Sequence, residues 1–263
     1  MIHSTAIVDP SAQIGENVSV GPFAIVGPNC VVGANTELGP HVVLEAFTTV
    51  GRDCQVGAGA VLGGPPQDAK FKGERSYLRI GDRNRLREYV TLHRATGEDQ
   101  ETVVGDDNLI LAYSHAGHNC RIGSNVLIAN NVELAGQVTI EDGAILGGLV
   151  GVHQFVRIGR RALVGGFSKV VQDVPPFLVA DGRPADVLDL NAHGLRRAGV
   201  KPASRKALRG AYQLLYRANL NVSQALEAIE AEIAPDPEVA YLVAFMQRIK
   251  GGSSGRQDDR RRE

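Results

Sequence analysis

Residues 14–44 read IGENVSVGPFAIVGPNCVVGANTELGPHVVL, and every sixth residue in this stretch is aliphatic, from Ile14 to Leu44. The same register, followed from Ile2 to Val170, falls on an apolar residue everywhere except at Asp68, Glu74 and Glu98. Glycine often follows the aliphatic residue, and the residue two places before it is small or branched. Because side chains alternate along a strand, these two positions point to the same side. The pattern therefore predicts short strands with one buried face.

A hexad of this kind forms one short strand and a turn, and three hexads, about 18 residues, close one triangular coil. Such a coil cannot bury its apolar face alone, so coils stack at the ordinary interstrand spacing of about 4.8 Å. The predicted fold is mainly β: a left-handed parallel β-helix of hexapeptide repeats, an exception to the right-handed crossover rule. Residues one coil apart are expected to lie directly above one another.

Composition agrees with a stacked repeat. The chain of 263 residues has no tryptophan, 5% aromatic residues and 31 glycines, so small and branched side chains must fill its interior. A net charge of -1 gives no reason to expect nucleic acid as a partner. No signal peptide or transmembrane segment is recognisable, and a cytoplasmic protein is expected. Cys30, Cys54 and Cys120 all fall on inward positions, which favours reduced core thiols over disulfides.

The repeat predicts a β-helix over residues 1–185, with external loops near 63–79 and 94–102, where prolines and charges interrupt the hexads. Consecutive prolines at 175 and 176 end the ladder. Apolar residues at helical spacing then predict an α-helical domain over 186–250, with helices over 203–219, 222–234 (capped by Ser223) and from Pro237 to about Lys250. The composition of residues 251–263 (GGSSGRQDDRRRE) predicts a disordered tail.

The candidate site is the stretch Ser114-His115-Ala116-Gly117-His118-Asn119-Cys120. His118 occupies an outward position of its hexad, and Gly136 follows one coil later, so the two should be neighbours. An imidazole beside a free glycine N–H suits acyl transfer, because one is a general base and the other a donor to an oxyanion.

Two other interpretations of this face are open. His93, His115 and His153 also lie outside the inward positions, so a zinc site of the γ-carbonic-anhydrase kind is an alternative, although no pair of positions shows that family's usual ligand spacing convincingly. A non-catalytic β-helix scaffold is the other.

Several dispersed motifs resemble one family: Gln67-Asp68 with Lys70, Gly73 and Glu74; Ile80-Gly81-Asp82-Arg83-Asn84-Arg85; Thr91-Leu92-His93-Arg94; Leu134-Ala135-Gly136; Val152-His153-Gln154-Phe155; Gln172-Asp173-Val174-Pro175-Pro176; and Gly194-Leu195-Arg196-Arg197. Together they are similar to the acyl-ACP:UDP-N-acetylglucosamine O-acyltransferase (LpxA) family of hexapeptide-repeat acyltransferases, which begins lipid A synthesis. The resemblance runs from Ile2 to about residue 250.

The resemblance implies a transfer of a 3-hydroxyacyl chain from acyl carrier protein to the 3-hydroxyl of UDP-N-acetylglucosamine. His118 matches the general base and Gly136 the oxyanion donor. Substrate contacts are implied for Asp68, His115, His153, Gln154, Asn191 and Arg197. The resemblance also implies a homotrimer with sites between adjacent prisms. It implies no metal and no cofactor beyond the carrier's phosphopantetheine.

Gly166 matches the position that limits the acyl chain, and the absence of a side chain there favours a chain on the order of C12 to C14 by resemblance, each buried methylene contributing about 0.8 kcal/mol. Three residues depart from the family pattern: Asn119 replaces Asp, Gln137 replaces His, and His193 replaces Glu. A 3-amino UDP-sugar therefore stays open as an alternative acceptor.

Overall fold

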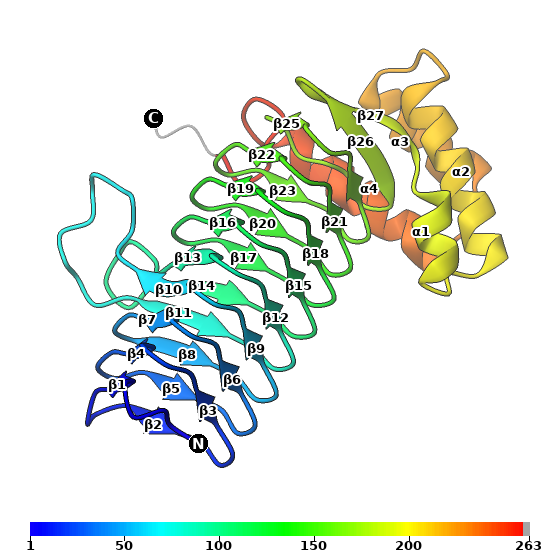
Figure 1. The fold of residues 1–263 in the computed structure, drawn as a ribbon. Coiled ribbons are helices and arrows are strands. Elements are labelled where there is room, and N and C mark those ends of the chain that lie inside the picture. Colours follow the sequence, from blue (N-terminus) through cyan, green and yellow to red (C-terminus); the bar gives the residue numbers. More distant parts are fainter. Residues whose placement is uncertain (260–263) are drawn as a thin grey trace.

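Three parallel β-sheets form the walls of a long triangular prism, and a group of helices closes its C-terminal end (Figure 1). The computed structural model describes residues 1–259. The first sheet contains β1 (Ile7–Val8), β4 (Ile25–Val26), β7 (Val43–Leu44), β10 (Val61–Gly64), β13 (Thr91–His93), β16 (His115–Ala116), β19 (Glu133–Leu134), β22 (Gly151–Val152) and β25 (Lys169–Val170).

The second sheet contains β2 (Gln13–Ile14), β5 (Val31–Val32), β8 (Thr48–Val50), β11 (Tyr77–Ile80), β14 (Glu101–Val104), β17 (Arg121–Ile122), β20 (Thr139–Ile140) and β23 (Arg157–Ile158). The third contains β3 (Ser19–Val20), β6 (Glu37–Leu38), β9 (Gln55–Val56), β12 (Arg85–Leu86), β15 (Leu109–Ile110), β18 (Leu127–Ile128), β21 (Ile145–Leu146), β24 (Leu163–Val164), β26 (Leu178–Gly182) and β27 (Ala185–Leu190). From β1 to β25, every third strand belongs to the same sheet, which confirms the predicted left-handed β-helix.

The predicted inward positions are buried. Val26, Leu44 and Leu62 are at most 1% exposed, and the cysteines Cys30, Cys54 and Cys120 are free thiols in the same core. A left-handed corner separates successive strands, and the residue there has a positive φ, as at Asn17 (57°). Asparagine tolerates this conformation.

Two insertions lengthen the coils without changing the register. Leu62 pairs with Leu92 and Leu92 with Ala116, so the spacing between partners grows from 18 to 30 and then 24 residues. All three spacings are multiples of six, which is why the aliphatic register resumes after each insertion. The inserted loops span residues 65–76 and 94–100, shorter than expected because β10, β11 and β14 extend into the predicted loop ends.

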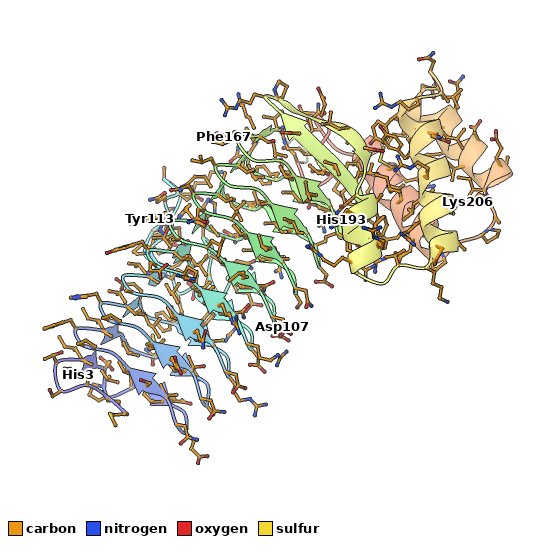
Figure 2. The ribbon with its side chains drawn as sticks, turned by 45° about the vertical axis from the view of Figure 1, so that its right-hand side comes forward. His3, Asp107, Tyr113, Phe167, His193 and Lys206 are labelled. Carbon is orange, nitrogen blue, oxygen red and sulfur yellow. The ribbon has the colours of Figure 1, made fainter. Side chains whose placement is uncertain are left out.

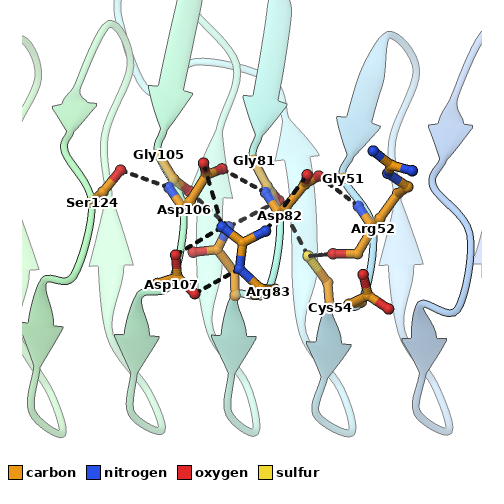
Figure 3. A network of polar contacts seen from close by, with 12 residues as sticks. Gly51, Arg52, Cys54, Gly81, Asp82, Arg83, Gly105, Asp106, Asp107 and Ser124 are labelled. Atoms are coloured by element: carbon orange, nitrogen blue, oxygen red, sulfur yellow. Dashed lines mark hydrogen bonds and ion pairs between the residues drawn. The ribbon is translucent and has the colours of Figure 1, made fainter.

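A polar ladder runs across neighbouring coils at one corner of the prism (Figure 3). The N–H of Arg52 donates to Asp82 at 2.8 Å, and the N–H of Asp82 donates to Asp106 at 2.7 Å. Arg83 makes a bidentate contact with Asp107, with both N–O distances at 2.8 Å. The carboxylates of Asp82 and Asp106 thus satisfy backbone donors that point away from the sheets.

The C-terminal domain packs α1 (Ala192–Arg197), α2 (Pro202–Tyr216), α3 (Val222–Glu232) and α4 (Pro237–Lys250) around a core that includes Leu208, Ile229 and Leu242. The hairpin β26–β27 joins this domain to the prism, so the third sheet continues past the predicted boundary at residue 185. Asn221, not Ser223, caps α3, in a capping box with Gln224. No helix in residues 1–259 is both long and apolar enough to span a membrane.

The structure differs from the expected disordered tail over residues 251–259. Asp173 donates its N–H to the carbonyl of Gly255 at 2.8 Å, and its carboxylate accepts from the N–H of Gln257 at 2.8 Å. Arg157 pairs with Asp258 at 2.9 Å. Composition could not reveal these contacts because they join positions far apart in the chain. Residues 260–263 of the predicted tail lie outside the described residues.

Candidate active site

His118 lies just beyond β16, at the turn that follows the buried Ala116. Its side chain is 16% exposed, so the imidazole is sheltered without belonging to the core. Nδ1 of His118 lies 2.8 Å from Oδ1 of Asn119. The contact leaves Nε2 directed away from Asn119 and available to a substrate.

Gly136 lies next to His118, as the spacing of one coil predicts. The N–H of Gln137 donates to the carbonyl of His118 at 2.8 Å, which fixes the two turns side by side. A Cβ on residue 136 would overlap Nε2 of His118 and lie 2.7 Å from its Cε1. The N–H of Gly136 donates no hydrogen bond within the described part of the chain. Only glycine allows the ring to lie so close to this turn.

Asp68 reaches the same imidazole from the loop at residues 65–76. One of its carboxylate oxygens lies 3.8 Å from Nε2 of His118, and its side chain is 19% exposed. The N–H of Lys70 donates to Asp68 at 3.0 Å and, with the neighbouring His118, holds the pKa of Asp68 below its usual value. A carboxylate therefore faces the side of His118 that is free.

His115 and His93 form a neutral wall beside His118 and Asp68. Their ring centroids are 4.8 Å apart in an edge-to-face arrangement, and Nδ1 of His115 lies 2.8 Å from the hydroxyl of Thr91. Burial, together with His93, lowers the pKa of His115 to about 4. Burial, with His118 and Arg94, also lowers the pKa of His93. Both rings are therefore neutral at physiological pH.

A cavity of about 600 Å³ opens along the first sheet in front of these residues. It brings together His115, His118, Gly136, His153 and Gln154, which are five of the predicted site residues. Three further polar side chains line it: Gln67, which the sequence analysis quoted in a motif without giving it a role, and Glu133 and Lys169, which it did not name. Glu133 pairs with His115 in register and Lys169 lies two coils further on, so the spacing that identified Gly136 could have found both.

Asn191 and Arg197 lie elsewhere, in a second cavity of about 640 Å³ along the third sheet. The side chain of Asn191 is engaged: it caps α1 by accepting the N–H of Gly194 at 3.0 Å, and it donates to the carbonyl of Arg161 at 2.9 Å. Within one chain, these two residues do not share a cavity with His118.

Gly166 is exposed at a turn near the end of the prism and does not line the cavity of His118 within one chain. The neighbouring Phe167 is 59% exposed, and the guanidinium of Arg183 lies 5.6 Å from its ring centre. Phe167 and Tyr113 both project from the prism rather than into its core (Figure 2).

The other departures from the family pattern are exposed. Gln137 occupies a left-handed corner with a φ of 62°, and His193 lies on α1 (Figure 2) with its Nδ1 3.4 Å from Arg196. In residues 1–259, no group of three or more His, Cys, Asp or Glu side chains is arranged to hold a metal ion. The described residues thus offer no observation that favours the zinc-site alternative.

The arrangement of His118, Gly136 and Asp68 suits an attack by a hydroxyl on a carbonyl carbon. Nε2 can accept the hydroxyl proton, and the N–H of Gly136 can donate to the oxygen that becomes negative. The carboxylate of Asp68 can orient a polar acceptor beside Nε2. A long cavity leaves room for an extended donor.

Known proteins and family models match this chain over most of its length. Residues 173–255 match the family model "Udp N-acetylglucosamine O-acyltransferase; Domain 2", and residues 11–46, 29–64 and 101–136 match the bacterial transferase hexapeptide model. An acyl-[acyl-carrier-protein]--UDP-N-acetylglucosamine O-acyltransferase of Burkholderia orbicola is 48% identical over 256 residues, covering 95% of this chain and 98% of the relative. Its counterpart in Gloeothece citriformis is 47% identical over 207 residues, covering 79% and 75%.

Solved structures of the same family have the same fold as this chain. LpxA from Acinetobacter baumannii superposes with a TM-score of 0.89 at 40% identity, covering 94% of this chain and 96% of that one. LpxA from Bacteroides fragilis, described as a UDP-N-acetylglucosamine acyltransferase, gives a TM-score of 0.91 at 37% identity, covering 94% and 97%. Sequence motifs, fold and relatives point the same way, and the chain belongs to the acyl-[acyl-carrier-protein]--UDP-N-acetylglucosamine O-acyltransferase family.

Proposed function

We propose that this protein transfers a 3-hydroxyacyl chain from acyl carrier protein to the 3-hydroxyl of UDP-N-acetylglucosamine, the first step of lipid A biosynthesis. The observation that carries the proposal is the placement of Nε2 of His118 against Gly136, whose N–H donates no hydrogen bond within residues 1–259, in the lining of a cavity of about 600 Å³. Membership in the family supports the proposed substrates, and this geometry supports the proposed chemistry.

In the proposed reaction, Nε2 of His118 removes the proton of the sugar 3-hydroxyl as its oxygen attacks the thioester carbon. The carbonyl oxygen becomes negative and accepts a hydrogen bond from the N–H of Gly136. The carbon–sulfur bond then breaks, and the imidazolium returns its proton to the departing phosphopantetheine thiolate. Preorganised donors and a positioned base are the two contributions the chain makes.

Substrate binding is proposed to divide between the two cavities. Asp68 and His115 contact the glucosamine ring beside His118, while His153 and Gln154 contact the rest of the nucleotide sugar. Arg197, beside Asn191, suits the phosphates because its guanidinium is a planar, permanently charged donor. Since the two cavities lie on different walls of one prism, we propose a homotrimer in which Arg197 of one subunit serves the His118 of its neighbour.

The acidic carrier protein is proposed to dock on the exposed cations of α1, of α2 and of the segment between them, namely Arg196, Arg197, Lys201 and Lys206. Lys206 lies on the helical domain, away from the prism (Figure 2). Arg209, which belongs to the same basic segment, is paired with Asp189 instead.

We propose that the reaction needs no metal and no dissociable cofactor beyond the carrier's phosphopantetheine. We also propose a cytoplasmic location, which the three free thiols suit.

The test is an acyl-transfer assay with purified protein and a series of 3-hydroxyacyl carriers of increasing length. UDP-N-acetylglucosamine and its 3-amino analogue are offered separately and in competition. Ester formation with the hydroxyl sugar, unaffected by a chelator, supports the proposal. Exclusive use of the 3-amino sugar would replace the ester by an amide and overturn the proposed acceptor, whereas loss of activity on chelation would overturn the metal-free reaction.

A further inference from the structure

The side-chain amide of Asn119 has two different ends, and each has its own partner. Its Oδ1 lies 2.8 Å from Nδ1 of His118 and accepts the N–H of Thr96 at 3.0 Å. Its Nδ2 donates to the carbonyl of Thr96 at 3.1 Å. Thr96 thus contacts both ends of the amide, from the loop at residues 94–100.

These contacts allow only one orientation of the amide. A backbone N–H can only donate and a carbonyl can only accept, so Oδ1 must face the N–H of Thr96 and Nδ2 its carbonyl. The end that faces His118 is then an acceptor. Nδ1 of the neutral imidazole must therefore carry the proton, which leaves Nε2 free to accept one.

A rotated amide would have the opposite effect. Its NH₂ group would face Nδ1, stabilise the tautomer with the proton on Nε2 and remove the basic nitrogen. In serine proteases, an asparagine that holds the wrong histidine tautomer lowers kcat by about 10⁴. An aspartate has no such wrong end, because both of its oxygens accept.

Glu74 holds the peptide between Thr96 and Gly97, whose carbonyl selects the orientation of the Asn119 amide. The N–H of Gly97 donates to Oε1 of Glu74 at 2.8 Å. This N–H belongs to the same peptide unit as the carbonyl of Thr96, so the bond to Glu74 turns that carbonyl toward Asn119. The other oxygen of Glu74 accepts the N–H of Lys72 at 2.7 Å, which holds the carboxylate itself.

We propose that Glu74 and the backbone of Thr96 are positioning elements that orient the Asn119 amide and so keep the proton of His118 on Nδ1. The proposal rests on the proposed function only in giving Nε2 the role of base. It assigns a purpose to both inserted loops: one supplies Glu74, the other supplies Thr96, and they meet behind the histidine.

The first test is the tautomer of His118, measured by long-range ¹H–¹⁵N correlation on full-length protein with ¹⁵N-labelled histidine. The signal is assigned by its loss in His118→Ala. Neutral His118 in the wild type should carry its proton on Nδ1, and Glu74→Ala should shift the signals toward the Nε2-protonated form. A wild type protonated on Nε2, or a Glu74→Ala spectrum unchanged from wild type, would overturn the proposal.

Glu98→Ala is the matched control, because it removes the same charge from the neighbouring loop without touching this peptide. The side chain of Glu98 is 62% exposed, and its ion pair is a 3.8 Å contact with Arg75. Its spectrum and kcat should match the wild type. For Glu74→Ala, we expect kcat to fall roughly 10- to 100-fold, as is typical when a group that orients a site residue is removed.

Asn119→Asp provides a rescue that a merely structural role of Glu74 would not predict. With a carboxylate at 119, the tautomer no longer depends on Thr96, so Glu74→Ala should change kcat by no more than about twofold in this background. An undiminished loss in the double variant would contradict the proposal. A changed tautomer with an unchanged kcat would leave the positioning role intact and argue instead against His118 as the base.

Discussion

Gly136 has no room for a side chain, because the ring of His118 occupies the place of its missing Cβ. A Cβ there would lie 2.7 Å from Cε1 and 2.9 Å from Cδ2 of the imidazole. The ring would have to move away from Asn119 or from Asp68. The position of residue 136 is outside the core, so the fold does not depend on it.

We therefore predict that Gly136→Ala keeps its fold and loses activity. Displacing a general base costs roughly 10²- to 10⁴-fold in rate, so kcat should fall within that range. Steady-state kinetics measure the loss, and the thermal unfolding midpoint, expected near the wild-type value, is the control. A kcat close to wild type would mean that the ring does not act from its present position.

His115 gives a prediction about pH. Burial lowers its pKa to about 4, whereas the unfolded chain titrates near the ordinary value of about 6.5. Between these values the unfolded state binds more protons, so His115 stabilises the fold fully above about pH 6.5 and loses this contribution as the pH falls toward 4.

His115→Asn should make the loss of stability between pH 6.5 and pH 4 less steep, because asparagine can keep the contact with Thr91 and does not titrate. Chemical unfolding at several pH values measures this. His93 has a lowered pKa as well and remains in both proteins, so only the difference between the two curves reports on His115. Parallel curves would contradict the assignment.

At the scale of elements, the hexad determines most of what could be predicted. Alternation placed Val26, Leu44 and Cys120 in the core, and the coil length placed Gly136 beside His118. The contacts of Asn119 could not be predicted from the sequence, because they depend on the loop at residues 94–100, whose conformation follows no repeat. Asn119 stands where the family pattern has aspartate, and its amide contacts both His118 and Thr96.

The prediction that Gly166 limits the acyl chain also concerns an element, because it depends on which turn of the β-helix the acyl chain reaches. A Cβ on residue 166 would lie 3.2 Å from the carbonyl oxygen of Gly148, so a side chain fits with a small adjustment. Gly166→Met should shift selectivity toward shorter 3-hydroxyacyl chains. Each excluded methylene is worth about 0.8 kcal/mol, or about fourfold in kcat/KM. An unchanged profile over chain lengths would place the acyl tail elsewhere.

At the scale of the whole molecule, the two cavities face different directions. The cavity that His118 lines lies along the first sheet, and the cavity that Arg197 lines lies along the third. A complete site therefore needs two copies of the chain if both residues contact one substrate. The sequence could not locate these faces relative to one another, because α1 is positioned by the hairpin β26–β27 rather than by the repeat.

Mixed oligomers test this arrangement. His118→Ala and Arg197→Ala, each impaired alone, should regain up to about a quarter of wild-type activity after co-refolding, since that share of random interfaces carries both intact residues. Each variant refolded alone is the control. If the mixture is no more active than the sum of its parts, both residues serve a site within one chain.

The most direct test of the account is the turnover of His118→Ala with 3-hydroxyacyl carrier protein and UDP-N-acetylglucosamine. The side chain is outside the core, so the variant should keep the wild-type unfolding midpoint and oligomeric state. Its kcat should fall by roughly 10²- to 10⁴-fold, the loss expected for a general base. A folded variant that retains near-wild-type kcat would contradict the central claim that His118 takes the proton of the sugar hydroxyl.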